Sequence, residues 1–420
     1  MKLITSTFLS FTATSAKLLN AFFLVKLVSI YIGPEGLAKM GQFHSFIYLM
    51  VLLSGGGINQ GIVKYISEYY NDEFKIKSIV ECGFTIVLIS SLFFFVAIFL
   101  FKEKISFAIF GTGEFSTIFA ITAFFQIFIS FGSYFLSILN GFKKFFEVFS
   151  VSFFGTIISA ISSCLLLYFF GFAGILFAYV FSQASSFLFS IFFLKNIFFK
   201  NIYSFKISYN FGTCKSLLSY SLMTIISAVI SNGSQFLIRN KLADTLSWVE
   251  VGYWEGVVRV SDAYIILLTT ALSIYCVPIF SGKSEKKDII NEVKLTFLFI
   301  VPLTFMISMF IYTFRFYVVD ILFSNEFYKM TDLFFWQLIG DIFRVSGMIF
   351  SYFLVAKARV KNFIFIEIFC SLLYLMLSYT FIPAYGLQGV IYAFLLNSLI
   401  FFIIGIFNFY KIIIRWDENK

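Results

Sequence analysis

Apolar residues form long runs along the whole chain, and short polar stretches separate them. A helix needs about 20 consecutive, mostly apolar residues to cross the hydrocarbon core of a bilayer, and the runs have this length. Outer-membrane strands would instead alternate apolar and polar residues over about 10 residues, which no part of the sequence does. The pattern predicts an all-α polytopic membrane protein with twelve transmembrane helices. The predicted spans are about 8–32, 44–66, 79–101, 117–139, 148–170, 175–195, 216–239, 252–277, 289–313, 333–356, 362–381 and 389–411.

The composition and the charge distribution agree with this class. Hydrophobic residues make up 60% of the chain and charged residues 13%, whereas soluble domains have about 45–50% and 25%. The net charge of +9 comes largely from basic residues in short loops, which the positive-inside rule explains. We therefore expect no nucleic-acid partner, and the loop charges place both termini in the cytoplasm.

The cysteines and the histidine carry no recognisable site. A single histidine excludes a histidine-based metal cluster, and the cysteine spacing indicates neither a metal site nor a disulfide framework. We expect the cysteines to be small, buried hydrophobic side chains, and we expect no metal and no cofactor. The five cysteines are Cys82, Cys164, Cys214, Cys276 and Cys370.

The second half of the sequence repeats short motifs of the first half at equivalent spans. Each match is weak alone, but three in the same order indicate an internal repeat. The matched pairs are Gly41-Gln42-Phe43 with Gly252-Tyr253-Trp254, Phe124-Phe125-Gln126 with Phe335-Trp336-Gln337, and the glycine-bounded segments starting at Gly171 and Gly386.

This repeat predicts two lobes of six helices each. Six is an even number, so both halves enter the membrane from the same side, as in parallel-repeat transporters whose substrate site lies between the halves. We expect an N-terminal lobe at 1–195, a cytoplasmic linker at 196–215 and a C-terminal lobe at 216–420. No loop is long enough for a soluble domain, so function must reside within or at the membrane.

Two spans of the second half carry charges among apolar residues. Glu255, Arg259 and Asp262 are spaced by four and three residues and share a helical face, as do Asp341 and Arg344. A charge at the bilayer centre costs about 2.5–3.5 kcal/mol on insertion scales, so such residues face a bundle interior or a wet cavity. Their depths predict two pairs between helices, Arg259 with Asp341 and Asp262 with Arg344.

Two interpretations of this cluster remain open. It is either a structural ion-pair network that locks two spans together or the lining of a cavity that contacts a charged substrate or a coupling ion. Asp262 or Asp341 could take up a coupled proton in the second case. A paired arginine still offers donors to a phosphate, so the two interpretations are compatible.

Three lysines are further candidates for substrate binding. Lys17 lies near the middle of the first span and must find a cavity or a partner, while Lys26 lies near its outer end and could snorkel. Lys64 lies at the cytoplasmic end of the second span, where a plain interfacial lysine is the alternative. Together with Arg259 and Arg344, these residues would favour an anionic group such as a phosphate or pyrophosphate.

A glycine run, Gly55-Gly56-Gly57, lies inside the predicted second span. Each glycine costs about 1 kcal/mol against alanine in a helix, so the run needs a reason. The alternatives are close helix packing and a hinge that bends during alternating access.

Several motifs together resemble the Wzx-type flippases of bacterial surface polysaccharide assembly, which include O-antigen and enterobacterial common antigen translocases. The resemblance covers nearly the whole chain. It rests on Gly33-Pro34 with Gly36-Leu37, Gly41 with Phe43, Gly61 to Tyr65, Ser261 to Tyr264, Trp336 to Asp341, and Ala356-Lys357-Ala358.

The resemblance implies a MATE-like member of the MOP exporter superfamily, with two six-helix lobes around a central cavity. It implies transport of an undecaprenyl-pyrophosphate-linked oligosaccharide from the cytoplasmic to the periplasmic leaflet of the bacterial inner membrane. Lys17, Lys26, Arg259 and Arg344 would match the cationic cavities of the family. A polysaccharide polymerase and a chain-length regulator are implied partners.

Two other functions are weaker alternatives. A cation-coupled drug or metabolite exporter of the same superfamily would favour an acidic cavity, whereas this one leans basic. A membrane-embedded polysaccharide polymerase or ligase would need a sizeable outer loop with catalytic groups. The largest predicted outer loop, at 314–332, has no convergent motif.

Overall fold

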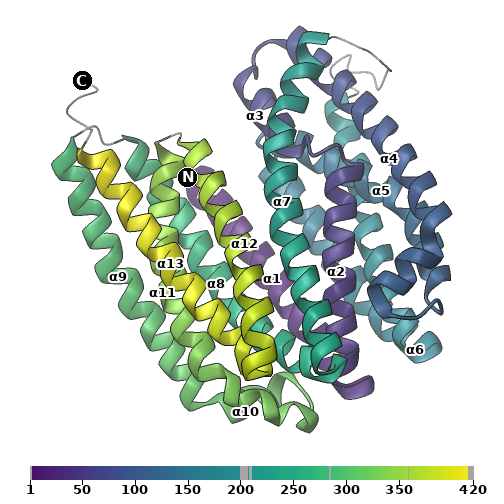
Figure 1. Ribbon diagram of the computed structural model, residues 1–420. Coiled ribbons are helices and arrows are strands. Elements are labelled where there is room, and N and C mark those ends of the chain that lie inside the picture. The colour runs from purple at the N-terminus through teal and green to yellow at the C-terminus, as the bar shows by residue number, and fades with distance from the viewer. Residues whose placement is uncertain (1, 199–206, 208–210, 283–284, 358, 415–420) are drawn as a thin grey trace. The chain divides into compact units, whose positions relative to one another are not determined.

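The computed structural model describes residues 2–198, 207, 211–282, 285–357 and 359–414, and its regular elements in these ranges are all helices (Figure 1). The predicted all-α class is confirmed. In chain order the helices are α1 Lys2–Tyr31, α2 Pro34–Ser54, α3 Asn59–Glu68, α4 Glu73–Phe110, α5 Ser116–Gly141, α6 Phe145–Phe198, α7 Phe211–Thr245, α8 Trp248–Gly282, α9 Lys286–Thr313, α10 Arg315–Leu322, the 3₁₀ helix η1 Asn325–Leu333, α11 Phe334–Ala356, α12 Val360–Tyr385 and α13 Leu387–Ile414.

Ten of the described helices are long and apolar enough to cross a membrane. One of them, in α6, runs over 51 residues, more than twice the length that a single crossing needs. Counting α6 as two crossings and adding the 35-residue α7 accommodates the twelve predicted spans. The protein is therefore a multi-pass membrane protein.

Two helical hairpins confirm the internal repeat in backbone geometry. Gly171 inside α6 has φ 56° and ψ −136°, and Gly386 between α12 and α13 has φ 59° and ψ −135°, a region that is easily reached only by glycine. Three residues later, a Cβ on Gly174 would lie 1.9 Å from the Leu166 carbonyl oxygen, and one on Gly389 would lie 2.2 Å from that of Phe381. The two halves thus use the same turn.

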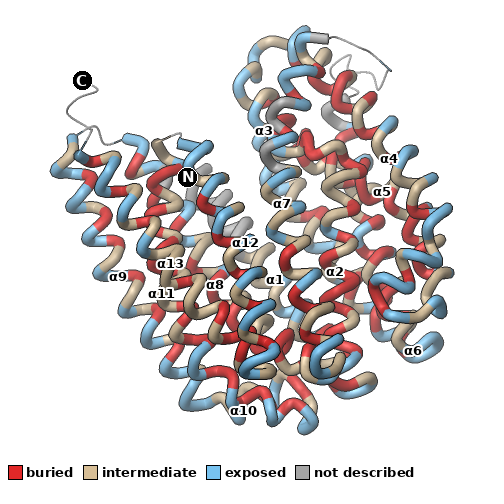
Figure 2. Tube along the Cα trace, viewed as in Figure 1, coloured by how far each residue is buried: buried red, intermediate tan, exposed pale blue. Residues whose placement is uncertain are grey.

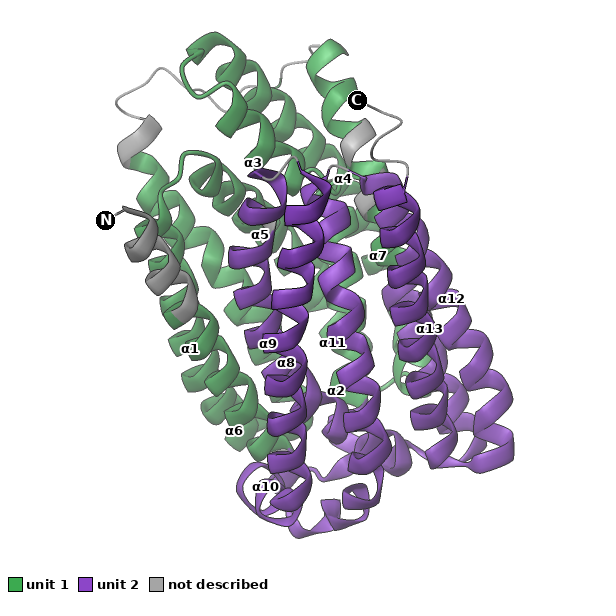
Figure 3. Ribbon diagram, turned by 90° about the vertical axis from the view of Figure 1, so that its left-hand side faces the viewer, with its two compact units in different colours: residues 1–28, 39–229 green, residues 29–38, 230–420 purple. Residues whose placement is uncertain are grey.

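The chain divides into two compact units, coloured separately in Figure 3. Unit 1 contains 1–28 and 39–229, and unit 2 contains Ser29–Ala38 and Ile230–Lys420. Helix α7 therefore contributes residues to both units. Most of the predicted linker, at 199–206 and 208–210, lies outside the described residues, so the lobe boundaries at 195 and 216 stay a prediction.

The core of unit 1 forms where α3, α4 and α5 pack together, and buried positions follow the inner faces of these helices (Figure 2). Tyr134 of α5 is fully buried and donates a hydrogen bond to the Val80 carbonyl oxygen at 2.5 Å. Gly83 and Gly141 let the helices approach, since a Cβ there would meet Tyr134 and Ile66 at 2.9 and 2.7 Å. Small residues at such contacts are typical of helix packing in membranes.

The glycine run ends α2 and divides the second predicted span. Gly57 donates its backbone N–H to the Leu52 carbonyl oxygen at 2.9 Å, and Gly56 donates to that of Leu53 at 3.0 Å. This pair of bonds is a Schellman motif, which needs a left-handed residue that is usually glycine, and Gly56 has φ 65°. The expectation of one continuous helix over 44–66 is therefore wrong, because α2 ends at Ser54 and α3 begins at Asn59.

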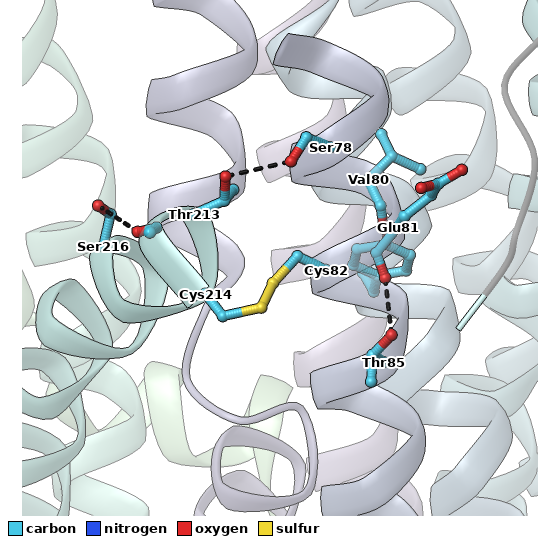
Figure 4. The surroundings of a disulfide bond; sticks show 10 residues. Ser78, Val80, Glu81, Cys82, Thr85, Thr213, Cys214 and Ser216 are labelled. Carbon is cyan, nitrogen blue, oxygen red and sulfur yellow. Dashed lines mark hydrogen bonds between the residues drawn. A yellow bond between two sulfur atoms is a disulfide. The ribbon is translucent and has the colours of Figure 1, made fainter. Parts of the chain in front are cut away.

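A disulfide bond joins Cys82 of α4 to Cys214 of α7 within unit 1 (Figure 4). The Cα atoms lie 5.8 Å apart across a sequence separation of 132 residues, and Ser78 and Thr213 share a hydrogen bond of 3.1 Å beside it. The expectation that these two cysteines are only hydrophobic side chains is wrong. Spacing along the chain could not reveal a pair that forms only when α4 and α7 pack together.

Candidate functional site

The charged residues of the second half lie on α8 and α11, which pack against each other within unit 2. Close contacts to α13 hold α11 in place. A Cβ on Gly340 would lie 2.7 Å from Phe394, and a Cβ on Gly347 would lie 2.5 Å from Phe401. The absence of a side chain at these glycines lets α11, which carries the charged side chains, pack closely against α13.

Glu255 lies between two arginines. Arg239 of α7 donates from Nε to Glu255 Oε2 at 3.0 Å, and Arg259 Nη2 lies 3.0 Å from Glu255 Oε1. Glu255 is 2% exposed and Arg239 7% exposed, and the Arg239 guanidinium lies 5.7 Å from the centre of the Trp254 ring. Two arginines against one carboxylate give this cluster a formal charge of +1.

Arg239 is not among the residues predicted from the sequence. It is the last residue of the predicted span 216–239, a position where a snorkelling arginine needs no explanation. The structure continues α7 to Thr245 and buries Arg239 against Glu255 instead. The available signal was Glu255 itself, because its carboxylate has two oxygens and can bind a second cation besides Arg259.

Of the two predicted pairs between helices, one is confirmed. Arg344 Nη1 lies 3.2 Å from Asp262 Oδ1, as expected from their equal depth. The pair of Arg259 with Asp341 is wrong. Arg259 binds Glu255 one turn away on its own helix, and the fully buried Asp341 accepts hydrogen bonds from Tyr264 at 2.6 Å and Gln337 at 3.4 Å.

Unit 1 carries uncharged residues at the equivalent positions. Gln126 and Ser130 of α5 correspond to Gln337 and Asp341. Gln126 donates to the Ser91 carbonyl oxygen at 2.6 Å, and Ser130 shares a 2.6 Å hydrogen bond with Ser54. The acidic residue Asp341 therefore has an uncharged counterpart, Ser130, in unit 1.

A cavity of about 400 Å³ opens within unit 2 between α7, α8, α11, α12 and α13. The Asp262–Arg344 pair lies in its wall together with Glu367 of α12. The remaining lining is mostly hydroxyl, amide and aromatic side chains, among them Trp254, Tyr352 and Asn397. The cavity can therefore hold a polar ligand inside an otherwise apolar unit.

The three predicted lysines lie in unit 1. Lys17 is exposed in α1 and Lys26 is half-buried, while the exposed Lys64 in α3 places Nζ 5.1 Å from the centre of the Tyr65 ring. Asn20, one turn from Lys17, donates to Ser159 of α6 at 3.1 Å and fixes this part of α1. The roles of these lysines in binding, and of the glycine run as a hinge, stay predictions.

Residues 3–284 match the family described as polysaccharide biosynthesis protein. The chain belongs to this family. The chain is 28% identical over 390 residues to the Lipid III flippase of Escherichia coli (strain K12), covering 93% of this chain and 94% of that protein. The Lipid III flippase of Shigella flexneri gives the same figures.

Similarity to solved structures shows the fold of the chain. An inward-facing multidrug resistance MATE family transporter of the MOP superfamily has a TM-score of 0.80 at 14% identity, with 97% and 96% of the two chains covered. A MOP superfamily transporter from Pyrococcus furiosus, described as having a binding pocket of reverse polarity, has a TM-score of 0.72 at 16% identity, covering 99% and 96%. The expected MATE-like fold and the resemblance to Wzx-type flippases are confirmed.

Proposed function

We propose that the protein is a flippase for an undecaprenyl-pyrophosphate-linked oligosaccharide, an O-antigen or common-antigen repeat unit. It moves this lipid from the cytoplasmic to the periplasmic leaflet of the bacterial inner membrane by alternating access, with both termini in the cytoplasm. The observation that carries the proposal is similarity along almost the full length of both chains to proteins named Lipid III flippase. The protein is accordingly a transporter and not an enzyme.

The charge cluster around Glu255 supports an anionic substrate group. Its formal charge is +1, and Arg259 keeps 27% of its side chain exposed while bound to Glu255. An arginine in this position can still donate charge-assisted hydrogen bonds to a phosphate oxygen. Arg259 is the residue that contacts the pyrophosphate, and Lys17, Lys26 and Lys64 are the further basic contacts.

The acidic residues have a different role in this proposal. Glu255 holds Arg239 and Arg259, while Asp262 orients Arg344. Asp341 is the candidate for coupling, because a buried carboxylate that receives hydrogen bonds from neutral groups can bind and release a proton. The polymerase and the chain-length regulator act on the delivered repeat unit and are the expected partners.

Deletion of the gene in its host tests the proposal. Lipid-linked repeat units should accumulate on the cytoplasmic side while surface polymer is lost, and the wild-type gene should restore both. Arg259→Gln should restore neither fully at unchanged membrane abundance. Surface polymer of normal amount and length after deletion would refute the flippase, and drug accumulation without a polymer defect would favour an exporter.

A further inference from the structure

Three residues that line the cavity of unit 2 carry buried polar atoms that lack partners. The indole Nε1 of Trp254, the Oε1 of Gln337 and the Oδ1 of Asn397 have no hydrogen-bond partner among the described residues. Trp254 is 1% exposed and Gln337 is 2% exposed, and all three residues line the cavity. Because unpaired buried polar groups are unfavourable, these atoms indicate a ligand that both donates and accepts hydrogen bonds.

The charge of the cavity argues against the pyrophosphate as that ligand. Asp262 and Glu367 line it together with Arg344, so two carboxylates face one guanidinium and the formal charge is −1. Within this sum, the carboxylate of Asp262 neutralises the guanidinium of Arg344. A dianionic group would meet repulsion here, whereas the neighbouring cluster of Arg239, Glu255 and Arg259 is formally positive.

The shape and chemistry of the walls fit a ring with apolar faces and polar edges. Trp254, Tyr352, Tyr374 and Phe394 supply aromatic surface, and Gln337 and Asn397 supply amides. Ligand pockets of a few hundred Å³ commonly combine aromatic walls with a few placed polar groups. A pyranose has C–H faces that pack on aromatic rings and hydroxyl groups that donate and accept around its edge.

We propose that this cavity binds one neutral sugar ring of the transported oligosaccharide, an inference that rests on the proposed function. Trp254 is the residue that connects the two sites. Its side chain lines the cavity, while the Arg239 guanidinium lies over its ring. A sugar in the cavity is therefore a neighbour of a phosphate held by Arg259, which is the order of groups in a lipid-pyrophosphate-sugar substrate.

Tryptophan fluorescence of the purified full-length protein tests the proposal, because Trp254 is one of only four tryptophans. The probes are uncharged methyl glycosides, including methyl N-acetylglucosaminide and methyl galactoside, with sodium chloride and inorganic pyrophosphate as the other two arms. A saturable response to at least one glycoside is expected, and it should disappear in Trp254→Phe. Asn397→Leu should weaken the apparent affinity about 3- to 10-fold through the lost hydrogen bond.

Asn408→Leu is the matched control, since Asn408 is an equally half-buried residue of α13 that bonds the Ile404 carbonyl oxygen away from the cavity. It should bind glycosides like the wild type. The sugar site would be refuted if the fluorescence responds to sodium chloride or pyrophosphate but to no glycoside, or if it responds to none of the probes. Gene deletion separates the two proposals. If surface polymer is lost but the protein binds no glycoside, the flippase proposal stands and the sugar site is refuted. If the protein binds glycosides but deletion causes no polymer defect, the flippase proposal is refuted.

Discussion

Replacing Glu255 by glutamine should destabilise unit 2 strongly. Both carboxylate oxygens of Glu255 bind an arginine at 3.0 Å, and the side chains of Glu255 and Arg239 are almost fully buried. Glutamine keeps the shape and leaves the buried guanidinium of Arg239 and the partly exposed guanidinium of Arg259 without an anion. Removing one partner of a buried ion pair costs about 3–5 kcal/mol.

The expected loss can be measured as thermal unfolding of the detergent-solubilised protein. For a folding unit of this size, 1 kcal/mol shifts Tm by about 2–4 °C, so Glu255→Gln should lower Tm by about 6–20 °C. Glu250→Gln is the control on the same helix. Its partner Lys329 is 61% exposed, and such surface pairs contribute about 0–1 kcal/mol.

A second substitution distinguishes charge from packing as the cause. Adding Arg239→Gln to Glu255→Gln removes one of the two stranded positive charges, so part of the lost Tm should return. The reasoning would be refuted if Glu255→Gln and Glu250→Gln had equal Tm values. It would also be refuted if Arg239→Gln lowered the Tm of the Glu255→Gln variant by as much as it lowers the Tm of the wild type. Contacts within one network are expected to be non-additive.

Three further predictions concern the backbone and the cysteines. Gly252→Ala should sharply reduce the amount of folded protein in size-exclusion profiles, because its Cβ would lie 2.1 Å from the Pro34 carbonyl oxygen, whereas Gly155→Ala, with no atom within 4 Å, should not. Gly57→Ala should also lower Tm, since Gly57 has φ 63° and a Cβ would lie 2.7 Å from Ile225; a Tm equal to that of Gly155→Ala would contradict this. Maleimide labelling of the denatured, unreduced protein should modify Cys164, Cys276 and Cys370 alone, with two more sites after reduction, and five labelled thiols before reduction would disprove the disulfide.

The sequence predicted those parts of the fold that depend on local chemistry. Apolar runs located the helices, and the segments beginning at Gly171 and Gly386 identified turns of equal torsion. The pair of Asp262 with Arg344 followed from depth alone, because both helices cross the membrane in the same direction. Helix ends were less predictable, since the continuation of α7 past Arg239 depends on a partner in another helix.

The remainder of the site depends on tertiary packing. Both Glu255 and Asp341 were possible partners of Arg259. Only the structure shows that Arg259 binds Glu255, while Asp341 accepts a hydrogen bond from Tyr264. The cavity could not be predicted either, because its wall combines residues of five helices. Trp254 is buried between the cavity and the Arg239 guanidinium, a placement that also depends on tertiary packing.

The short segment Ser29–Ala38 has a practical consequence for engineering. It belongs to unit 2 although nearly two hundred residues separate it from the rest of that unit, and Pro34 in it packs against Gly252. A gene fragment that starts near residue 211 would therefore encode an incomplete fold. Chimaeras between relatives should exchange this segment together with the C-terminal half, and complementation by two co-expressed fragments should depend on it.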